Sequence, residues 1–227
     1  MQTVIRIKKI SGILLLLLLL NIKYCAAQFG ANVTFDGSTQ SIVAPPGMMN
    51  GATVFTIEYW IKTTESRSNG TYWQSPAMIA TISDGSISGD FGITSNNGFI
   101  SMWSGLNSSG DNSFQSATTQ INDNAWHHIA AVNNGTIITL YVDGISQGTI
   151  SSGLGLYTAN APLTMGAGSL NFGWAGNVGF CNFFHQGIMD EVRFSNNVRY
   201  TTNFTVPGSA FTSDANTVAL YHFGWLR

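Results

Sequence analysis

The stretch GIMDEVRF at residues 187–194 decides the fold expected for this chain. Alternation with a period of two predicts a β-strand that puts one carboxylate on the same face as three large apolar residues. These residues are Asp190 with Ile188, Val192 and Phe194. A carboxylate buried among apolar side chains is costly unless it is hydrogen-bonded, paired or bound to a metal. Asp190 is therefore the first candidate functional residue.

The same short-period pattern recurs along the chain, and no segment predicts a helix of any length. Gly, Pro and Asn-Gly punctuation separates short apolar or alternating segments, and Asn96-Asn97-Gly98 and Asp143-Gly144 predict hairpin turns. The expected strands are residues 32–37, 40–43, 55–63, 77–83, 90–94, 99–103, 113–120, 127–132, 136–142, 144–150, 163–167, 187–194 and 217–223. Such a series predicts an all-β fold, a two-sheet antiparallel jelly-roll sandwich.

The first residues predict a secretory leader. A basic start, an apolar run at residues 10–22 and small residues ending at Ala27 predict a signal peptide over 1–27, with a mature domain over 28–227. A membrane anchor is the alternative, but a spanning helix needs about 20 apolar residues. A lipoprotein is disfavoured by the bulky Tyr24 before the leader cysteine. We expect a secreted, extracellular protein that is not inserted in a membrane after cleavage.

Charge excludes several classes of partner. Beyond the leader there are five Lys/Arg against eleven Asp/Glu, a formal charge of −6. This sign argues against nucleic acid and against docking on anionic membranes. Cys181 is the one cysteine after the leader, so it is either buried and inert or pairs between chains. Candidate glycosylation sites, which matter only if the host glycosylates, are Asn32, Asn69, Asn107, Asn134 and Asn203.

Several blocks together resemble a known family, the laminin-G-like jelly rolls of the concanavalin-A-like lectin/glucanase superfamily. The blocks are VTFDG at 33–37, FTIEYWIK at 55–62, WHHIA at 126–130, LYVDG at 140–144, residues 187–194, and a closing signature at 198–207 and 219–223. The chain departs from the family in lacking its cysteine pair and in a long glycine-aromatic loop at 166–187. The resemblance implies two antiparallel sheets, one of them concave, and non-catalytic recognition of glycans or proteins.

The carboxylates do not predict an enzyme. Glycosidases of this superfamily carry acidic residues two apart on one strand, so that both face the substrate. Asp190 and Glu191 are adjacent, and Glu58 has no acidic neighbour two residues away. His127 and His128 are adjacent on a strand, point to opposite faces and are predicted to be structural.

Calcium is the one cofactor that the sequence suggests. In jelly rolls of this family, the resemblance implies, an acidic residue at the position of Asp190 often helps to hold a structural calcium ion. Calcium takes several oxygen ligands, and Asp36 is the candidate second carboxylate. The alternative is that Asp190 accepts backbone N–H bonds and Asp36 only shapes a turn. No other cofactor is expected.

Aromatic residues supply candidate glycan contacts. On the strand at 55–62, Glu58 and Trp60 share one face, where the indole could stack on a sugar ring. Trp103 is a candidate for the same surface. The alternative is that a loop covers Trp60. The loops at 65–75 and 166–187 carry the remaining candidates, Trp73 and Trp174.

We therefore expect a secreted, non-catalytic module that recognises carbohydrate. Its partners would be glycans or extracellular proteins, and a homo-oligomer is compatible with the sequence. The alternative is a structural or self-assembling extracellular surface subunit, such as a matrix, filament or virion decoration protein. Cys181 and the aromatic loop at 166–187 favour that alternative.

Overall fold

A computed structural model describes most of the chain beyond the leader. The described residues are 29–30, 32–45, 47–49, 52–68, 75–81, 91–105, 111–152, 163–168 and 183–223. The predicted signal peptide lies outside them. No helix occurs among the described residues, and therefore none that is long and apolar enough to span a membrane.

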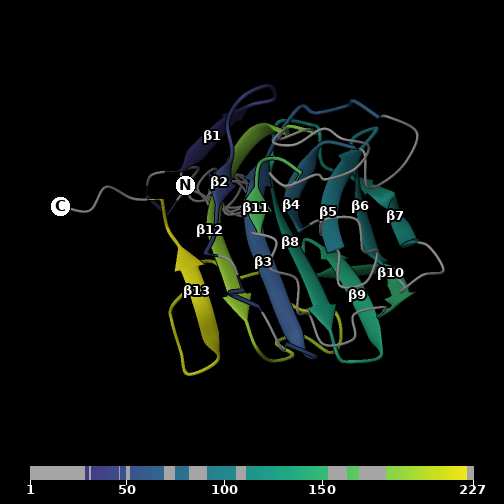
Figure 1. The fold of residues 1–227 in the computed structure, drawn as a ribbon, viewed down its shortest axis with the longest axis vertical. Coiled ribbons are helices and arrows are strands. Elements are labelled where there is room, and N and C mark those ends of the chain that lie inside the picture. The colour runs from purple at the N-terminus through teal and green to yellow at the C-terminus, as the bar shows by residue number, and fades with distance from the viewer. Residues whose placement is uncertain are drawn as a thin grey trace, which may run out of the picture.

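Within the described ranges, thirteen strands form two antiparallel sheets, which confirms the predicted jelly-roll sandwich (Figure 1). Sheet A has the order β1 (Val33–Asp36), β12 (Gln186–Ser195), β3 (Phe55–Lys62), β8 (Trp126–Asn133), β9 (Ile137–Val142) and β10 (Ile145–Ser151); β13 (Thr217–Tyr221) also pairs with β12. Sheet B has the order β2 (Ile42–Val43), β11 (Thr164–Met165), β4 (Ala77–Thr81), β5 (Phe91–Asn96), β6 (Phe99–Gly105) and β7 (Asp111–Gln120).

The predicted hairpin turns are present. Asn97 and Gly98 join β5 to β6, and Asp143 and Gly144 join β9 to β10, all four with positive φ. Turns of this kind suit the right-handed twist of the strands and favour Asn or Asp followed by Gly. At Gly144 an added Cβ would lie 2.0 Å from the carbonyl oxygen of Phe204, so a second reason requires glycine there.

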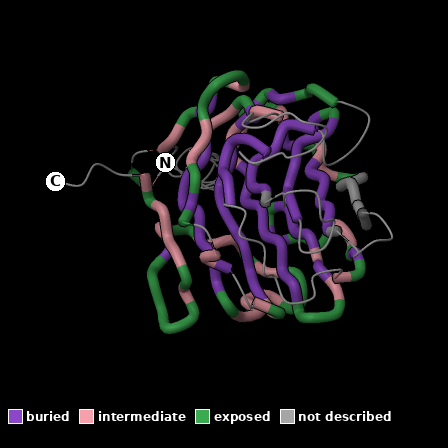
Figure 2. Tube along the Cα trace, in the orientation of Figure 1, coloured by how far each residue is buried: buried purple, intermediate pink, exposed green. Residues whose placement is uncertain are grey.

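The hydrophobic core lies between the two sheets. On β3 the residues Ile57, Tyr59 and Ile61 face sheet B, where Ile93 and Met102 belong to the same buried cluster. Figure 2 shows the central strands of the sandwich as buried, among them β3, β5 and β8, and many of the turns as exposed. Each large apolar side chain that is fully buried stabilises the fold by about 1.5 to 3 kcal/mol.

Candidate functional site

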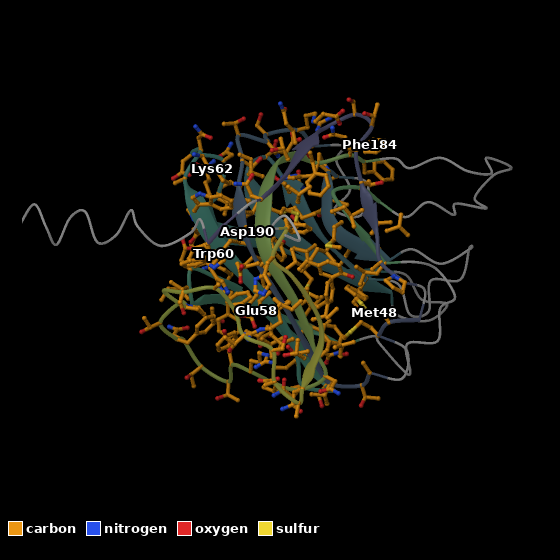
Figure 3. All side chains as sticks on the ribbon, turned by 90° about the vertical axis from the view of Figure 1, so that its left-hand side faces the viewer. Met48, Glu58, Trp60, Lys62, Phe184 and Asp190 are labelled. Atoms are coloured by element: carbon orange, nitrogen blue, oxygen red, sulfur yellow. The ribbon has the colours of Figure 1, made fainter. Side chains whose placement is uncertain are left out.

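The outer face of sheet A, turned away from the core, carries Glu58 and Trp60. Because side chains alternate along a strand, these two residues point away from the sandwich core that Ile57, Tyr59 and Ile61 enter. Across the sheet, Trp60 lies between Asp190 of β12 and His128 of β8. Figure 3 shows Trp60, Lys62 and Asp190 on one side of the edge-on sandwich and Met48 and Phe184 on the other.

A C-terminal strap, residues 196–214, covers this face. Thr56 Oγ1 donates to the carbonyl oxygen of Asn197 at 2.8 Å and accepts from the Arg199 amide at 3.0 Å. Further along, the Phe204 amide donates to the carbonyl oxygen of Gly144 at 2.9 Å. The strap therefore runs from β3 across the sheet to the β9–β10 turn.

Aromatic side chains fill the space beneath the strap. The Tyr200 and Phe204 rings stack with centroids 3.5 Å apart, and Tyr141 of β9 meets both edge-on. Phe211, at the returning end of the strap, packs in one cluster with Trp60. As a result Trp60 is 3% exposed.

Glu58 is the centre of a buried ionic cluster. Its Oε1 accepts from Arg193 at 2.9 and 2.6 Å, while its Oε2 faces His128 Nε2 at 3.2 Å and accepts from the Tyr200 hydroxyl at 2.7 Å. Burial alone would raise the pKa of Glu58, but the contacts with His128, Arg193 and Tyr200 outweigh it and lower the pKa. Glu58 is thus an ionised anchor for the strap.

The expectation that Glu58 and Trp60 line a concave binding surface is therefore wrong. Both side chains are buried in contacts beneath the strap. For Trp60 this is the alternative that the sequence left open, in which a loop covers the indole. The closing block at 198–207 contained the strap residues Tyr200 and Phe204, and Phe211 follows it, but nothing in the sequence showed that they cross sheet A. Trp103 does not share a surface with Trp60 either, since it belongs to sheet B.

The orientation expected for Asp190 is also wrong, because β12 contains a β-bulge. The register with β3 shifts between Asp190 and Arg193, and Glu191 has a φ of 53°. The extra residue reverses the alternation, so that Met189, Val192 and Phe194 face the core while Asp190 points outward opposite Trp60.

Glu191, the neighbour of Asp190 in the bulge, is fully buried. One of its oxygens accepts from the Phe211 amide and the other meets His222 Nδ1 at 2.6 Å. The bulge therefore turns a carboxylate toward the returning end of the strap. It fastens the strap as Glu58 does, at a second point.

Trp60 and its two cross-strand neighbours each have a polar side-chain atom that forms no hydrogen bond with any described residue. These atoms are Asp190 Oδ2, Trp60 Nε1 and His128 Nδ1, and all three are buried. The other Asp190 oxygen accepts from the Glu191 amide at 2.8 Å. Burial raises the pKa of Asp190 to about 6, against an ordinary value of 3.8.

The two candidate calcium ligands are not brought together. Asp36 pairs with Gln186 of β12. Gln186 is four residues before Asp190, which corresponds to about 13 Å along the strand. The Asp36 carboxylate accepts from the amides of Ser38 and Thr39, each at 2.8 Å, and so shapes its own turn. Within the described ranges no three His, Cys, Asp or Glu side chains form a metal-binding group.

Sheet B carries Trp103 on its outer face. Trp103 pairs with Gly92 of β5, where an added Cβ would lie 2.6 Å from the indole ring. The absence of a side chain at Gly92 therefore lets the ring lie across the neighbouring strand. Ser101, two residues before Trp103, shares this face, and Ser101 Oγ and Trp103 Nε1 have no partner among the described residues. Trp103 is 2% exposed.

The remaining candidates divide into described and undescribed residues. Trp73, Trp174, Cys181 and the sequons at Asn69 and Asn107 lie outside the described part of the chain. Asn134 and Asn203 are exposed and Asn32 is half-buried. Oδ1 of Asn134 and of Asn203 accepts backbone N–H bonds. Glycosylation stays a prediction.

A family model matches most of the chain. The model is described as the concanavalin A-like lectin/glucanases superfamily, of the laminin G type, and it matches residues 36–203. No curated protein sequence matches the chain.

Solved structures with similar folds are glycan-binding and matrix domains. Domain 4 of AbnA, an extracellular arabinanase from Geobacillus stearothermophilus solved with arabinotriose, aligns with a TM-score of 0.51 and 18% identity, over 74% of this chain and 72% of that domain. The sialidase module CBM40 of Ruminococcus gnavus, bound to α2,3-sialyllactose, aligns with a TM-score of 0.53 and 12% identity, over 77% and 91%.

A third similar structure is a putative carbohydrate-binding protein from Bacteroides ovatus. It aligns with a TM-score of 0.58 and 15% identity, over 87% of this chain and 52% of that protein. At such identities the likeness shows the fold alone.

Proposed function

Because the chain belongs to the concanavalin A-like lectin/glucanase superfamily, we propose that it is a secreted, non-catalytic module that binds carbohydrate. The folds of the arabinotriose-bound and sialyllactose-bound domains support this class of ligand. The burial of Glu58 under the strap, with both oxygens bonded, supports a protein without glycosidase chemistry. The basic, apolar and small-residue pattern of residues 1–27 supports secretion.

The observation that carries the proposal is the match of residues 36–203 to the concanavalin A-like lectin/glucanase superfamily. The strap occupies the outer face of sheet A, so a ligand has no access to Trp60 or Glu58. On the outer face of sheet B, Trp103 is 2% exposed and Ser101 is fully buried, so these two side chains are not open to a ligand either. Sugars are bound by aromatic rings together with hydroxyl and amide groups. We therefore propose Trp73 and Trp174, the two remaining candidate tryptophans, as the glycan contacts.

The experiment is glycan-array binding of the full mature chain and three variants. Trp73→Ala and Trp174→Ala should each weaken binding at least about tenfold, a change of about 1.4 kcal/mol. Trp60→Phe is the matched control and should bind as the wild type does, because Trp60 is buried beneath the strap. Loss of binding in Trp60→Phe alone would contradict the assignment to Trp73 and Trp174.

Circular dichroism on the variants at the assay temperature separates a lost site from a lost fold.

A structural calcium ion at Asp190 is a separate proposal, now without Asp36 as a shared ligand. The unpartnered Asp190 Oδ2 supports it, whereas the absence of a three-residue ligand group among the described residues does not. A chelator should lower the melting temperature of the wild type and leave that of Asp190→Ala unchanged. An unchanged wild-type midpoint rejects the calcium proposal.

The second candidate function is a self-assembling surface subunit, and one observation favours it. Half-exposed apolar residues gather along the edge formed by β1, β2 and β13; they are Val33, Ile42, Val43, Met48, Val218, Ala219 and Tyr221. Light scattering across a range of protein concentrations tests this candidate. A mass that rises with concentration, together with no bound glycan, would favour assembly over carbohydrate binding.

A further inference from the structure

The two lateral sides of the sandwich differ in how their sheets end. On one side β7 and β10 lie against each other, and the Thr118 hydroxyl donates to Gln147 Oε1 at 2.7 Å (Figure 1). On the opposite side β1 and β13 follow one another along the same edge of β12, and β2 ends sheet B. Within the described ranges no further strand pairs with β1, β2 or β13. We call these the closed side and the open side.

β13 has a free backbone edge on the open side. Its residues Thr217–Tyr221 pair with β12 in an antiparallel ladder, which uses every second backbone N–H and C=O of the strand. Residues 218–221 form no backbone hydrogen bond with a described residue outside that ladder. Natural proteins protect such edges with Pro or with charged side chains, and the sequence TVALY contains neither. This edge is therefore open to pairing with another strand.

Exposed apolar side chains also gather on the open side. Three large apolar side chains are exposed in the described part of the chain, and two of them lie here: Val218 of β13 is 38% exposed and Val43 of β2 is 45% exposed. The third, Ile145, begins β10 on the closed side. The open side thus combines unpaired backbone groups with apolar surface, which is the combination that a second strand can cover.

The sequence of β13 is complementary to itself in an antiparallel pair. With Ala219 opposite Ala219 of a second copy, Thr217 lies opposite Tyr221 and Val218 lies opposite Leu220. All five residues then have a cross-strand partner, whereas any other centre leaves some of them unpaired. Pairs of β-branched, aliphatic and aromatic side chains of this kind stabilise antiparallel sheets.

Charge does not oppose such a pair. Residues 217–221 contain no charged side chain, and beyond the ends of the strand Asn216 would face His222 of the second copy. Like charges directly opposite each other, which destabilise a sheet, are therefore absent. A two-fold axis brings the same edge from both copies, so a second copy satisfies the unpaired backbone groups of both strands at once.

We propose that two copies of this chain associate through their β13 strands into a closed two-fold dimer, in which the two A sheets become one continuous sheet. Both copies use the same edge, so the assembly stops at two chains and does not grow into a filament. This inference goes beyond carbohydrate binding and does not depend on it. One strand pair with a few apolar side chains is a small interface, so we expect a dissociation constant of about 1 to 100 μM.

Sedimentation equilibrium of the full mature chain, from about 1 to 300 μM, tests the dimer. Val218→Lys places a charge on the paired edge and should raise the dissociation constant at least about tenfold. Ile145→Lys is the matched control, because it makes the same change at an exposed apolar residue of the closed side. Its dissociation constant should equal that of the wild type.

A cysteine at the two-fold axis tests the register. In a Cys181→Ser background, Ala219→Cys should form a disulfide between two copies on mild oxidation. The reason is that directly opposite residues of an antiparallel pair have Cα atoms about 4.5 to 5.5 Å apart, which a disulfide can span. Ile145→Cys in the same background is the control and should stay uncross-linked on a non-reducing gel.

The outcomes separate this inference from the proposed function. A mass of one chain at every concentration overturns the dimer, as does equal weakening by the two lysine variants in folded form or the absence of a cross-link at Ala219→Cys. A mass that rises beyond two chains overturns the closed dimer and favours the self-assembling subunit. A wild type that dimerises without binding any glycan rejects the proposed function and leaves the dimer standing.

Discussion

At the scale of single residues, Asp190 shows the clearest conflict between burial and the charge of a carboxylate. Its carboxylate is buried, Oδ1 accepts the Glu191 N–H at 2.8 Å, and Oδ2 has no partner among the described residues. Burial disfavours the ionised form and, with the charge of Glu191 acting in the same direction, raises the pKa to about 6. A group whose pKa is raised by folding contributes stability below its unfolded pKa of 3.8, and that contribution is lost as the pH rises toward 6.

Asp190→Asn is therefore expected to stabilise the protein at neutral pH in calcium-free buffer. The amide keeps the acceptor for the Glu191 N–H and removes the buried charge. The gain in unfolding free energy should reach at most about 3 kcal/mol at pH 7.5 and shrink below pH 5. Urea unfolding at several pH values measures it. Asp36→Asn is the opposite control, because hydrogen bonds from Thr39 and Ser38 lower the pKa of Asp36.

His127 makes a second pH-dependent contact. Its Nδ1 lies 2.8 Å from Asp143 and its Nε2 lies 3.1 Å from Asp123. Two carboxylate partners require both ring nitrogens to carry protons. Burial alone would lower the pKa of His127, but the two carboxylates outweigh it and raise the pKa above 6.5.

His127→Gln should consequently lose stability that is present below pH 6.5 and disappears as the pH rises through the folded pKa. The expected loss at pH 6 is about 1.5 kcal/mol, the size of one charge-assisted hydrogen bond. Thermal unfolding at pH 6 and pH 9 checks this, and a difference that is equal at both values contradicts a charged His127.

At the scale of elements, β12 and the strap form one unit. The bulge at Asp190–Glu191 changes which side chains of β12 face outward, so that Arg193 lies opposite Glu58 and Glu191 meets the strap amide of Phe211. The Arg193 guanidinium also lies 4.4 Å from the centre of the Phe211 ring. Arg193 therefore contacts both Glu58, which anchors the strap to sheet A, and Phe211 at the returning end of the strap.

Arg193→Met should destabilise the protein by about 3 to 5 kcal/mol, because it leaves Oε1 of the buried Glu58 carboxylate without its two hydrogen bonds from a guanidinium. The double variant Glu58→Gln with Arg193→Met should recover part of that loss. Lys62→Met, on the same sheet, is the control and should change stability by less than about 0.5 kcal/mol. Urea unfolding of the wild type, Glu58→Gln, Arg193→Met and the double variant measures the coupling, and additive losses would contradict it.

At the scale of the whole molecule, the two sheets differ in their outer faces. The outer face of sheet A is covered by the strap and contains the ionic contacts of Glu58, whereas the outer face of sheet B carries the buried Trp103. The strap adds a further packed layer over sheet A, and we expect the fold to depend on it.

Truncation after Ser195 is therefore expected to abolish folding. It removes the strap and β13, exposes the Trp60 face, and leaves the Glu58 carboxylate without Tyr200. Circular dichroism and the cooperativity of thermal unfolding measure the result. Truncation after Phe223 is the control and should leave the fold intact. A cooperative transition in the shorter protein would show that the strap is dispensable.

Much of the fold followed from local patterns. Alternation and Asn-Gly or Asp-Gly turns predicted the strands and hairpins, because side-chain period and turn chemistry are local properties. The orientation of Asp190 did not follow, since a bulge inserts one residue without a mark that alternation can detect. The burial of Trp60 did not follow either, because the strap that covers it lies more than 130 residues away in the sequence.

The sequence by itself determined the all-β class, the turns, the charge and the absence of cations between residues 68 and 126 and between residues 129 and 184. These are properties of composition and of neighbours along the chain. Only the tertiary structure decided that GIMDEVRF points its aspartate outward, that Glu58 and Trp60 anchor a strap, and that Trp103 lies on the other sheet. Those outcomes depend on strand register and on contacts between distant segments, and neither is written in any local pattern.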